Sequence, residues 1–230
     1  MTADSASINL THHFLIAMPG LEDETFAKSV VYVCEHSERG AMGLVINKPG
    51  ELSMKGLFEK VDLPLHRQDL MNACVLKGGP VHTERGFVLH DALWNHEAES
   101  LGQTPVQQSL IEAQAPAELA QEASALLAVS DKESVYASTM SIPGGLEMTT
   151  SKDVLEALSM GAGPKRVLIS LGYSAWGEGQ LESELAENSW LTVGADMAVI
   201  FDTPVEQRYE SAMKLLGLES WMLSSEVGHS

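Results

Sequence analysis

Short apolar runs, each closed by glycine, proline or polar residues, recur along the chain and predict β-strands. The runs cover residues 14–17, 30–34, 42–46, 74–77, 86–90, 167–171 and 197–201. A polar connection at 35–40, which ends in Gly40, predicts that the second and third runs form an antiparallel hairpin. The run at 167–171 is apolar at almost every position, which is typical of a strand buried on both faces.

Other segments carry apolar side chains at helical spacing, and they predict short helices. These segments lie near residues 52–61, 153–160, 181–185 and 204–216. Ser53 is a candidate N-cap for the first, and Thr150 with Asp153 has the spacing of a capping box before the second. Thr203 followed by Pro204 gives the strongest helix start in the chain, because proline is tolerated at the first helical position.

The length of 230 residues suits one domain, residues 1–230, with an ample core. Apolar residues make up 44% and charged residues 20%, which is ordinary for a globular protein. The charge is not ordinary, because 32 acidic against 14 basic side chains give a formal net charge of -18. Such a surface repels nucleic acid and anionic lipid. No cluster of Lys and Arg offsets it, so we expect no direct binding of duplex DNA.

Targeting signals are missing from the sequence as it stands. The first residues, MTADSASINLTHH, have neither a basic start nor an apolar core, and no apolar run approaches membrane-spanning length. The cysteines, Cys34 and Cys74, lie in apolar contexts and form no CxxC motif, which indicates buried thiols in a reducing compartment. A cytoplasmic location without a membrane partner is therefore expected.

The segment from Gly172 to Gln180 follows an apolar run and predicts a turn that carries chemistry-bearing side chains. A nucleophile elbow has the pattern G-x-S-x-G, but Ser174 is followed two residues later by Trp176 instead of glycine. A phosphate loop is disfavoured as well, since Glu178 and its acidic neighbours repel an anion. Ser174 or Cys34 could still act as the nucleophile of a hydrolase or transferase if folding brought a histidine close.

The eight histidines show no metal-ligand spacing, so neither a metal nor another cofactor is expected. Three loops that each follow an apolar run share small or polar residues, at 47–49, 78–80 and 172–180. If those strands are neighbours, the loops converge on one rim and form a ligand site. The candidate residues are Asn47, Lys48, Gly78, Gly79, Tyr173, Ser174, Trp176 and Gln180. The alternative is that each loop is simply a turn that needs glycine or proline.

Several long segments resemble one family. MPGLEDETFAKSVVYVCEHSERGAMGLVINKP, GGPV, RGFVLH, MTTSKDVLEAL and SLGYSAWGEGQLESELAENSWL are similar to signature segments of the AlgH/YqgE family of bacterial proteins. The resemblance implies a single α+β domain in which a curled, mixed, largely antiparallel and partly barrel-like sheet is flanked by helices. It also implies a role in transcriptional regulation, without catalytic residues to carry over. The segment at about 94–135 departs from the family and predicts a partly helical surface insertion.

Without a recognisable set of acid, base and nucleophile, the sequence favours a binding protein over an enzyme. We expect a regulatory protein that binds a small molecule or a protein partner and acts indirectly on transcription. A hydrolase or transferase is the alternative, and a direct DNA-binding regulator is disfavoured by the charge.

Overall fold

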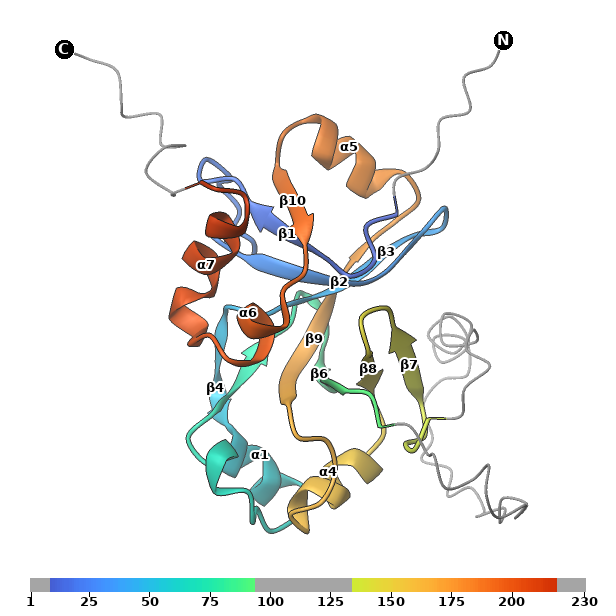
Figure 1. The fold of residues 1–230 in the computed structure, drawn as a ribbon, viewed down its shortest axis with the longest axis vertical. Helices are drawn as coiled ribbons and strands as arrows, with labels where there is room; N and C mark the ends of the chain where they lie inside the picture. The colour runs from blue at the N-terminus through green and yellow to red at the C-terminus, as the bar shows by residue number, and fades with distance from the viewer. Residues whose placement is uncertain (1–8, 94–133, 219–230) are drawn as a thin grey trace, which may run out of the picture.

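A computed structural model describes residues 9–93 and 134–218. The predicted insertion at about 94–135 lies almost entirely outside the described residues, so its helical character stays a prediction. The described parts form one curled sheet with short helices on its faces and ends (Figure 1). This architecture confirms the α+β class and the curled, largely antiparallel sheet expected from the sequence.

The sheet contains every strand of the described residues. Their bounds are β1 His13–Ala17, β2 Val30–Ser37, β3 Gly40–Val45, β4 Pro49–Ser53, β5 Cys74–Lys77, β6 Val81–Asp91, β7 Thr139–Ile142, β8 Leu146–Thr149, β9 Val167–Trp176 and β10 Trp190–Gly194. The order is β10-β1-β2-β3-β9-β6-β8-β7, and the β4–β5 ribbon joins through β5. The β5–β9 pair is parallel, whereas the other strand pairs are antiparallel.

Short helices cover the sheet. Their bounds are α1 Met54–Lys60, α4 Asp153–Ser159, α5 Gln180–Ala186, α6 Met197–Phe201 and α7 Arg208–Leu215, with 3-10 turns η1 Gln68–Leu70 and η2 Val205–Gln207. In Figure 1, α1 and α4 lie at one end of the molecule, α5 lies at the other, and α6 with α7 lies along one side.

The predicted hairpin is present as β2 and β3, and its register pairs Val31 with Val45. Apolar side chains on both faces of these strands are buried, because each face contributes to a different core cluster. A register shift between Val33 and Glu35 adds a bulge, which lets the ribbon bend with the curled sheet.

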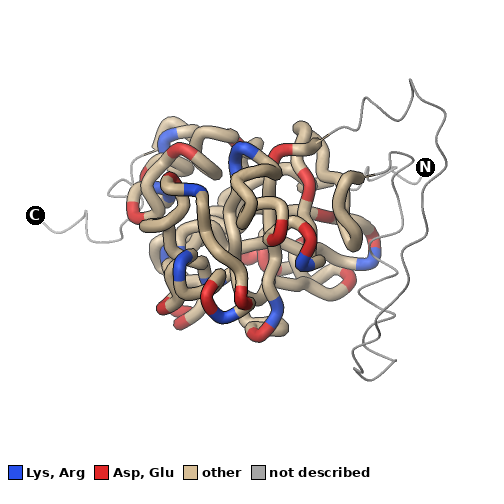
Figure 2. Tube along the Cα trace, turned by 90° about the horizontal axis from the view of Figure 1, so that it is seen from below, with Lys and Arg blue, Asp and Glu red and all other residues tan. Residues whose placement is uncertain are grey.

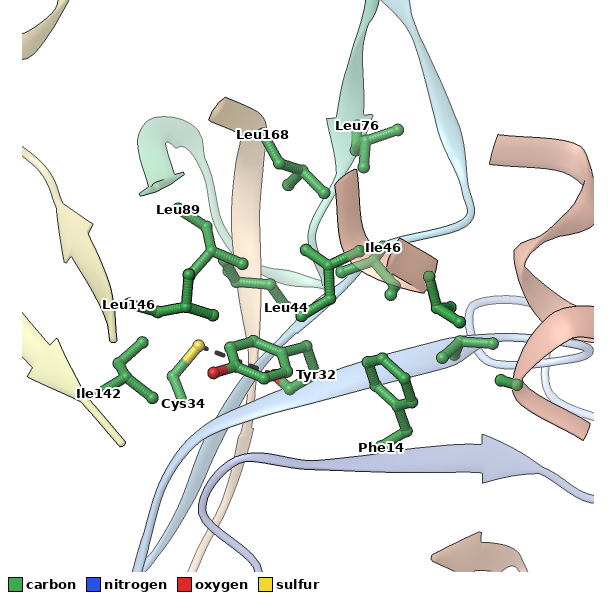
Figure 3. Close-up of a cluster of buried hydrophobic side chains, with 14 of the residues drawn as sticks. Phe14, Tyr32, Cys34, Leu44, Ile46, Leu76, Leu89, Ile142, Leu146 and Leu168 are labelled. Atoms are coloured by element: carbon green, nitrogen blue, oxygen red, sulfur yellow. Dashed lines mark hydrogen bonds between the residues drawn. The ribbon is translucent and has the colours of Figure 1, made fainter. Parts of the chain in front are cut away.

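The largest core cluster lies between the sheet and the helices α6 and α7. Phe14, Tyr32, Leu44 and Ile46 meet the apolar faces of α6 and α7 there, and Figure 3 shows these aromatic and aliphatic side chains pointing toward one another. Fully burying one such side chain contributes about 1.5–3 kcal/mol, so this cluster is the main apolar support of the fold. A second cluster lies under α5, and a third lies between the sheet and the helices α1 and α4.

The second cluster is built around a pair of tryptophans. Trp176 and Trp190 approach edge to face with ring centroids 6.0 Å apart, and Phe26 packs against both rings. Leu181 of α5 is fully buried against this group, as the apolar spacing of the predicted helix requires. The tryptophans therefore hold α5 against the face of the sheet that carries the second cluster.

Three local predictions are wrong. The run 197–201 was expected to be a strand, but it is helix α6, because the Asp196 side chain accepts hydrogen bonds from the N–H groups of Ala198 and Val199. Thr203 does not cap a continuous helix, since its hydroxyl donates to Ala198 and the chain makes the 3-10 turn η2 before α7 begins.

The capping box before α4 is the third wrong prediction. Lys152 occupies the N-cap position, and the Thr150 hydroxyl donates to the carbonyl of Ser138 instead. The Asp153 carboxylate accepts from the N–H of Val154 and from the Ser151 hydroxyl. Asp153, rather than Thr150, therefore provides the side-chain acceptor at the start of α4. By contrast, Ser53 caps α1 as predicted, accepting from the N–H of Gly56.

Candidate functional site

The segment that the sequence presents as a turn is mostly a continuation of strand β9. The strand runs to Trp176, with Ser174 opposite Gly43 of β3. Gly172 has a φ of 71°, and a Cβ there would lie 2.6 Å from the carbonyl oxygen of Gly79. The glycine therefore bends the strand at a close approach rather than ending it, and Tyr173, Ser174 and Trp176 belong to the sheet.

Neither proposed nucleophile is placed for catalysis. Ser174 is fully buried, and its hydroxyl donates to the carbonyl of Gly78 at 3.2 Å. Cys34 is also buried, its thiol donates to the carbonyl of Tyr32, and burial raises the pKa of the thiol. In the described residues no histidine forms a hydrogen bond with either group. The structure therefore gives no support to the nucleophile hypothesis.

Trp176 and Gln180 join α5 to the sheet through one carboxylate. The indole N–H groups of Trp176 and Trp190 both donate to Oε2 of Glu184, at 2.9 and 2.7 Å. The Gln180 amide donates to Oε1 of Glu184 at 3.0 Å, and its own oxygen accepts from the N–H of Gly177. Both candidate residues are thus occupied by internal hydrogen bonds that fix the helix.

Asn47 is also a structural residue. Its Oδ1 accepts from the N–H of Val30 at 2.8 Å, and its Nδ2 donates to the carbonyl of Lys28 at 2.8 Å. The side chain therefore ties the end of β3 to the segment before β2. One hydrogen bond at each end of the amide gives Asn47 a structural role, and the recognition role stays a prediction.

The glycine turn after β5 meets β9 as the sequence predicts. Gly79 has a φ of 154°, and a Cβ there would lie 2.3 Å from the backbone of Tyr173, so only glycine fits. The N–H of Gly78 donates to the carbonyl of Leu171, and its carbonyl accepts from the N–H of Val45. The loops therefore converge, but the predicted Gly78 donor is used inside the sheet.

Tyr173 stacks beside the same turn. Its ring lies parallel to that of His82, with centroids 6.0 Å apart, and it also contacts Phe87 at 5.2 Å. These contacts place Tyr173 on the edge of the main core cluster. We find the ring packed against protein groups and not lining the cavity described next.

Lys48 and Gly79 line a cavity of about 720 Å³ beside the β4–β5 ribbon. Its lining includes the apolar residues Val75, Leu76 and Leu171 and the polar residues Thr25 and Thr83. Of the eight candidate site residues, only Lys48 and Gly79 belong to it. The lining of the cavity therefore overlaps the predicted ligand site at two residues, and its other residues were not predicted.

Three lysines gather around this cavity, which we term the lysine cavity. Lys48 follows β3, Lys60 ends α1, and Lys77 ends β5. Glu24 and Glu51 also line it. In the described part of the chain none of the three ammonium groups forms an ion pair with a carboxylate, although such pairs exist elsewhere, as between Lys55 and Glu59.

Lys48 is the least exposed of the three lysines. Its ammonium group donates to the carbonyl of Ala27 at 2.5 Å. Burial lowers the pKa of the Lys48 side chain, and the charge of the nearby Lys28 lowers it further. Lys48 and Lys28 thus bring two positive charges close together in a chain of net charge -18.

Sequence reasoning missed Lys60 and Lys77 because they meet Lys48 only after folding. Lys77 offered one signal, since it stands directly before Gly78-Gly79-Pro80 at the end of an apolar strand. Lys60 offered none, because a lysine in the last turn of a helix has a common capping role.

The described residues contain no group of three or more His, Cys, Asp or Glu side chains that could hold a metal ion. Within the same ranges, no helix has the length and hydropathy needed to cross a membrane.

Fold and site together define a single-domain α+β protein in which a curled sheet carries a lysine-lined cavity beside a two-stranded ribbon. The sequence profile of the AlgH-like family matches residues 14–131 and 119–221, and the chain belongs to this family. That membership confirms the resemblance found in the sequence.

The relatives cover the whole chain. A UPF0301 protein of Paracidovorax citrulli is 68% identical over 230 residues, which is 100% of both chains. A UPF0301 protein of Polaromonas is 63% identical over the same length and the same shares. The shared length indicates that the segment at about 94–135 is present in these relatives as well.

Solved structures show the same fold. The solution structure of the AlgH protein from Pseudomonas aeruginosa is 39% identical, with a TM-score of 0.64, and covers 98% of each chain. A crystal structure from Corynebacterium diphtheriae has a TM-score of 0.60 at 16% identity, covering 94% of this chain and 92% of that one. At that identity the second likeness concerns the fold alone.

Proposed function

We propose that the protein is a regulatory protein that binds a small anionic ligand in the lysine cavity. The observation that carries the proposal is the gathering of Lys48, Lys60 and Lys77, without carboxylate partners among the described residues, in a chain of net charge -18. Where acidic side chains outnumber basic ones so strongly, unpaired lysines at one cavity indicate a site for negative charge.

The chemistry of the cavity favours a compact anion with a small apolar part. An ammonium group is a compact point charge that binds phosphate or carboxylate oxygens without a fixed geometry. The hydroxyls of Thr25 and Thr83 can donate to further oxygens, while Val75 and Leu171 accommodate apolar atoms. Glu24 and Glu51 reduce the net charge, so a ligand with few negative charges fits best.

Ligand binding also relieves the electrostatic cost at Lys48. Burial and Lys28 lower its pKa because they disfavour the charged ammonium. An anion in the cavity supplies the missing counter-charge and raises that pKa again. Ligand binding therefore stabilises the folded protein, as expected of a sensor site.

We further propose that the protein works in the cytoplasm and that its effect on transcription is indirect. The free thiols of Cys34 and Cys74 support a reducing compartment. Figure 2 supports the indirect route, since Lys and Arg positions are interleaved with Asp and Glu positions rather than gathered in one patch. Occupancy of the cavity then controls an interaction with another molecule.

Calorimetric titration tests the proposal with a matched pair of variants on one helix. Lys60 lines the cavity, whereas Lys55 on the same helix pairs with Glu59 away from it. Titration uses inorganic pyrophosphate, citrate and adenosine monophosphate as probes. We expect at least one probe to bind the wild-type protein, and Lys60→Met to weaken it about fivefold, ~1 kcal/mol.

Lys55→Met is expected to bind the same probe as the wild-type protein does. The proposal fails if no probe binds, or if Lys55→Met and Lys60→Met weaken binding equally. The second outcome would indicate a general effect of surface charge.

A further inference from the structure

A second cavity, of about 580 Å³, is lined by residues of β5, the start of β9, α6 and the segments that flank them. Pro49 and Leu76 of the ribbon line both cavities. The walls of the second cavity combine apolar residues, Leu76, Leu168 and Phe201 among them, with charged ones. Such walls suit a ligand that has both an apolar part and a charged group.

Arg208 forms one wall of this cavity, and its side chain is more than nine-tenths buried. Its Nε donates to the carbonyl of Thr203 at 3.0 Å, and its Nη1 donates to the carbonyl of Ile46 at 2.5 Å. Among the described residues its Nη2 has no hydrogen-bond partner, and no carboxylate lies within ion-pair distance. The guanidinium is therefore a buried cation that forms no ion pair with a carboxylate among the described residues.

Burial has a measurable consequence for this group. It lowers the pKa of the Arg208 guanidinium to about 10, although the neighbouring Cys74 and Glu206 act in the opposite direction. A buried cation without a counter-charge destabilises the folded protein unless something compensates it. Two backbone carbonyls satisfy part of its hydrogen-bonding capacity but supply no full negative charge.

The rim of the cavity limits the charge of any ligand. Lys165 and Arg166 stand there against Asp69, Asp202 and Glu206. Asp69 is already paired with Arg67, so Asp202 and Glu206 are the carboxylates that a polyvalent anion still meets at this cavity. A single negative charge at Arg208 is the best match, because it pairs with the one buried cation.

We infer that this second cavity binds a monocarboxylate with an apolar tail. The carboxylate accepts from Nη2 of Arg208, and the tail lies along Leu76, Leu168 and Phe201, which belong to the same core cluster. Arginine suits this role because its planar fork matches carboxylate geometry. The inference is independent of the lysine cavity, whose charged groups and ligand class differ.

Cys74 provides a direct readout, because its partly exposed thiol lines the same cavity. The full-length protein is treated with iodoacetamide in the presence of octanoate, and alkylation is followed by peptide mass spectrometry. Only the free protein reacts, so octanoate at about ten times its dissociation constant slows alkylation of Cys74 about tenfold. Cys34 is the internal control, because it is buried and stays unmodified in the folded protein.

Octanamide, which has the same tail without the charge, is the matched ligand control. We expect it to protect Cys74 at a concentration about tenfold higher than octanoate, since it cannot form the charged pair with Arg208. Arg208→Met removes the charge but keeps an unbranched apolar side chain, and it is expected to erase the preference for octanoate. If this variant does not fold, the comparison of the two ligands on the wild-type protein decides.

Three outcomes overturn the inference: no protection by octanoate, equal protection by octanoate and octanamide, and stronger protection by octyl phosphate. The first would show that octanoate does not bind at this cavity, and the second would show that its charge does not contribute to binding. The third indicates a dianion site and contradicts the assignment of a monocarboxylate.

Discussion

Most polar residues that looked like ligand contacts in the sequence join parts of the fold. The Asn47 amide is engaged at both ends, and the Ser174 hydroxyl donates to a backbone carbonyl inside the sheet. A sequence shows the type of a polar side chain but not its partner, so a loop residue reads the same in either role. Lys48 differs, because it lines a cavity and lacks a carboxylate partner among the described residues.

Glu184 carries a prediction at this scale. Glu184→Ala leaves the indole N–H groups of Trp176 and Trp190 without their acceptor, and both rings are buried. A buried donor left unsatisfied costs about 1–3 kcal/mol, so we expect a loss of about 2 kcal/mol in the free energy of unfolding. Urea denaturation followed by tryptophan fluorescence measures it.

The control is Glu187→Ala, an exposed residue at the end of the same helix. It is expected to change stability by less than about 0.5 kcal/mol. Equal effects of the two substitutions would show that the double acceptance at Glu184 contributes nothing specific. Glu184→Gln should fall between them, because its carbonyl oxygen can still accept.

At the scale of elements, the sequence predicted the helices and strands that depend on residues close together in the chain. The β2–β3 hairpin, the Ser53 cap of α1 and the apolar face of α5 all follow from spacing within a few residues. The run 197–201 failed because a short apolar run does not distinguish a strand from a buried helix. The Asp196 cap favours the helix, and the prediction, which rested on the apolar run alone, did not consider this residue.

The predicted end of strand β9 was wrong for a different reason. Gly172 looked like the end of a strand, but β5 pairs with the part before it and β3 pairs with the part after it. The bend allows one strand to serve both neighbours in a curled sheet. Such pairing is a long-range property, so no pattern within the segment could have indicated it.

Helix α6 yields a prediction because it is short and a single side chain, Asp196, caps its start. Asp196→Ala removes the acceptor for the N–H groups of Ala198 and Val199 and is expected to lower the free energy of unfolding by about 1 kcal/mol. Asp202→Ala at the other end of the helix is the matched control, and it should be neutral or slightly stabilising because a negative charge opposes the helix dipole there. Chemical denaturation of both variants gives the comparison, and a larger loss for Asp202→Ala would contradict the cap.

At the scale of the whole molecule, the fold brings three distant lysines to one cavity. Lys48, Lys60 and Lys77 come from three different elements, and only the closure of the β4–β5 ribbon against β9 unites them. The net charge was readable from composition, whereas this local reversal of sign was not. Two of the eight residues chosen from sequence, Lys48 and Gly79, line the cavity.

The same charge distribution keeps direct DNA recognition an unfavourable hypothesis. Three lysines around a cavity neutralise too few phosphates for duplex binding at physiological salt. The absence of specific duplex binding stays a prediction, and it separates an indirect regulator from a DNA reader.

Nuclear magnetic resonance of the lysine side chains tests anion binding at the lysine cavity most directly. Lysines are dimethylated with carbon-13, which preserves their charge, and assigned by single Lys→Arg substitutions. Inorganic pyrophosphate or whichever probe binds in calorimetry is then titrated. We predict saturable shifts at Lys48, Lys60 and Lys77, while Lys55 and Lys165 stay unchanged. Equal, non-saturating shifts at all lysines, or shifts confined to lysines outside the cavity, would contradict the proposed site.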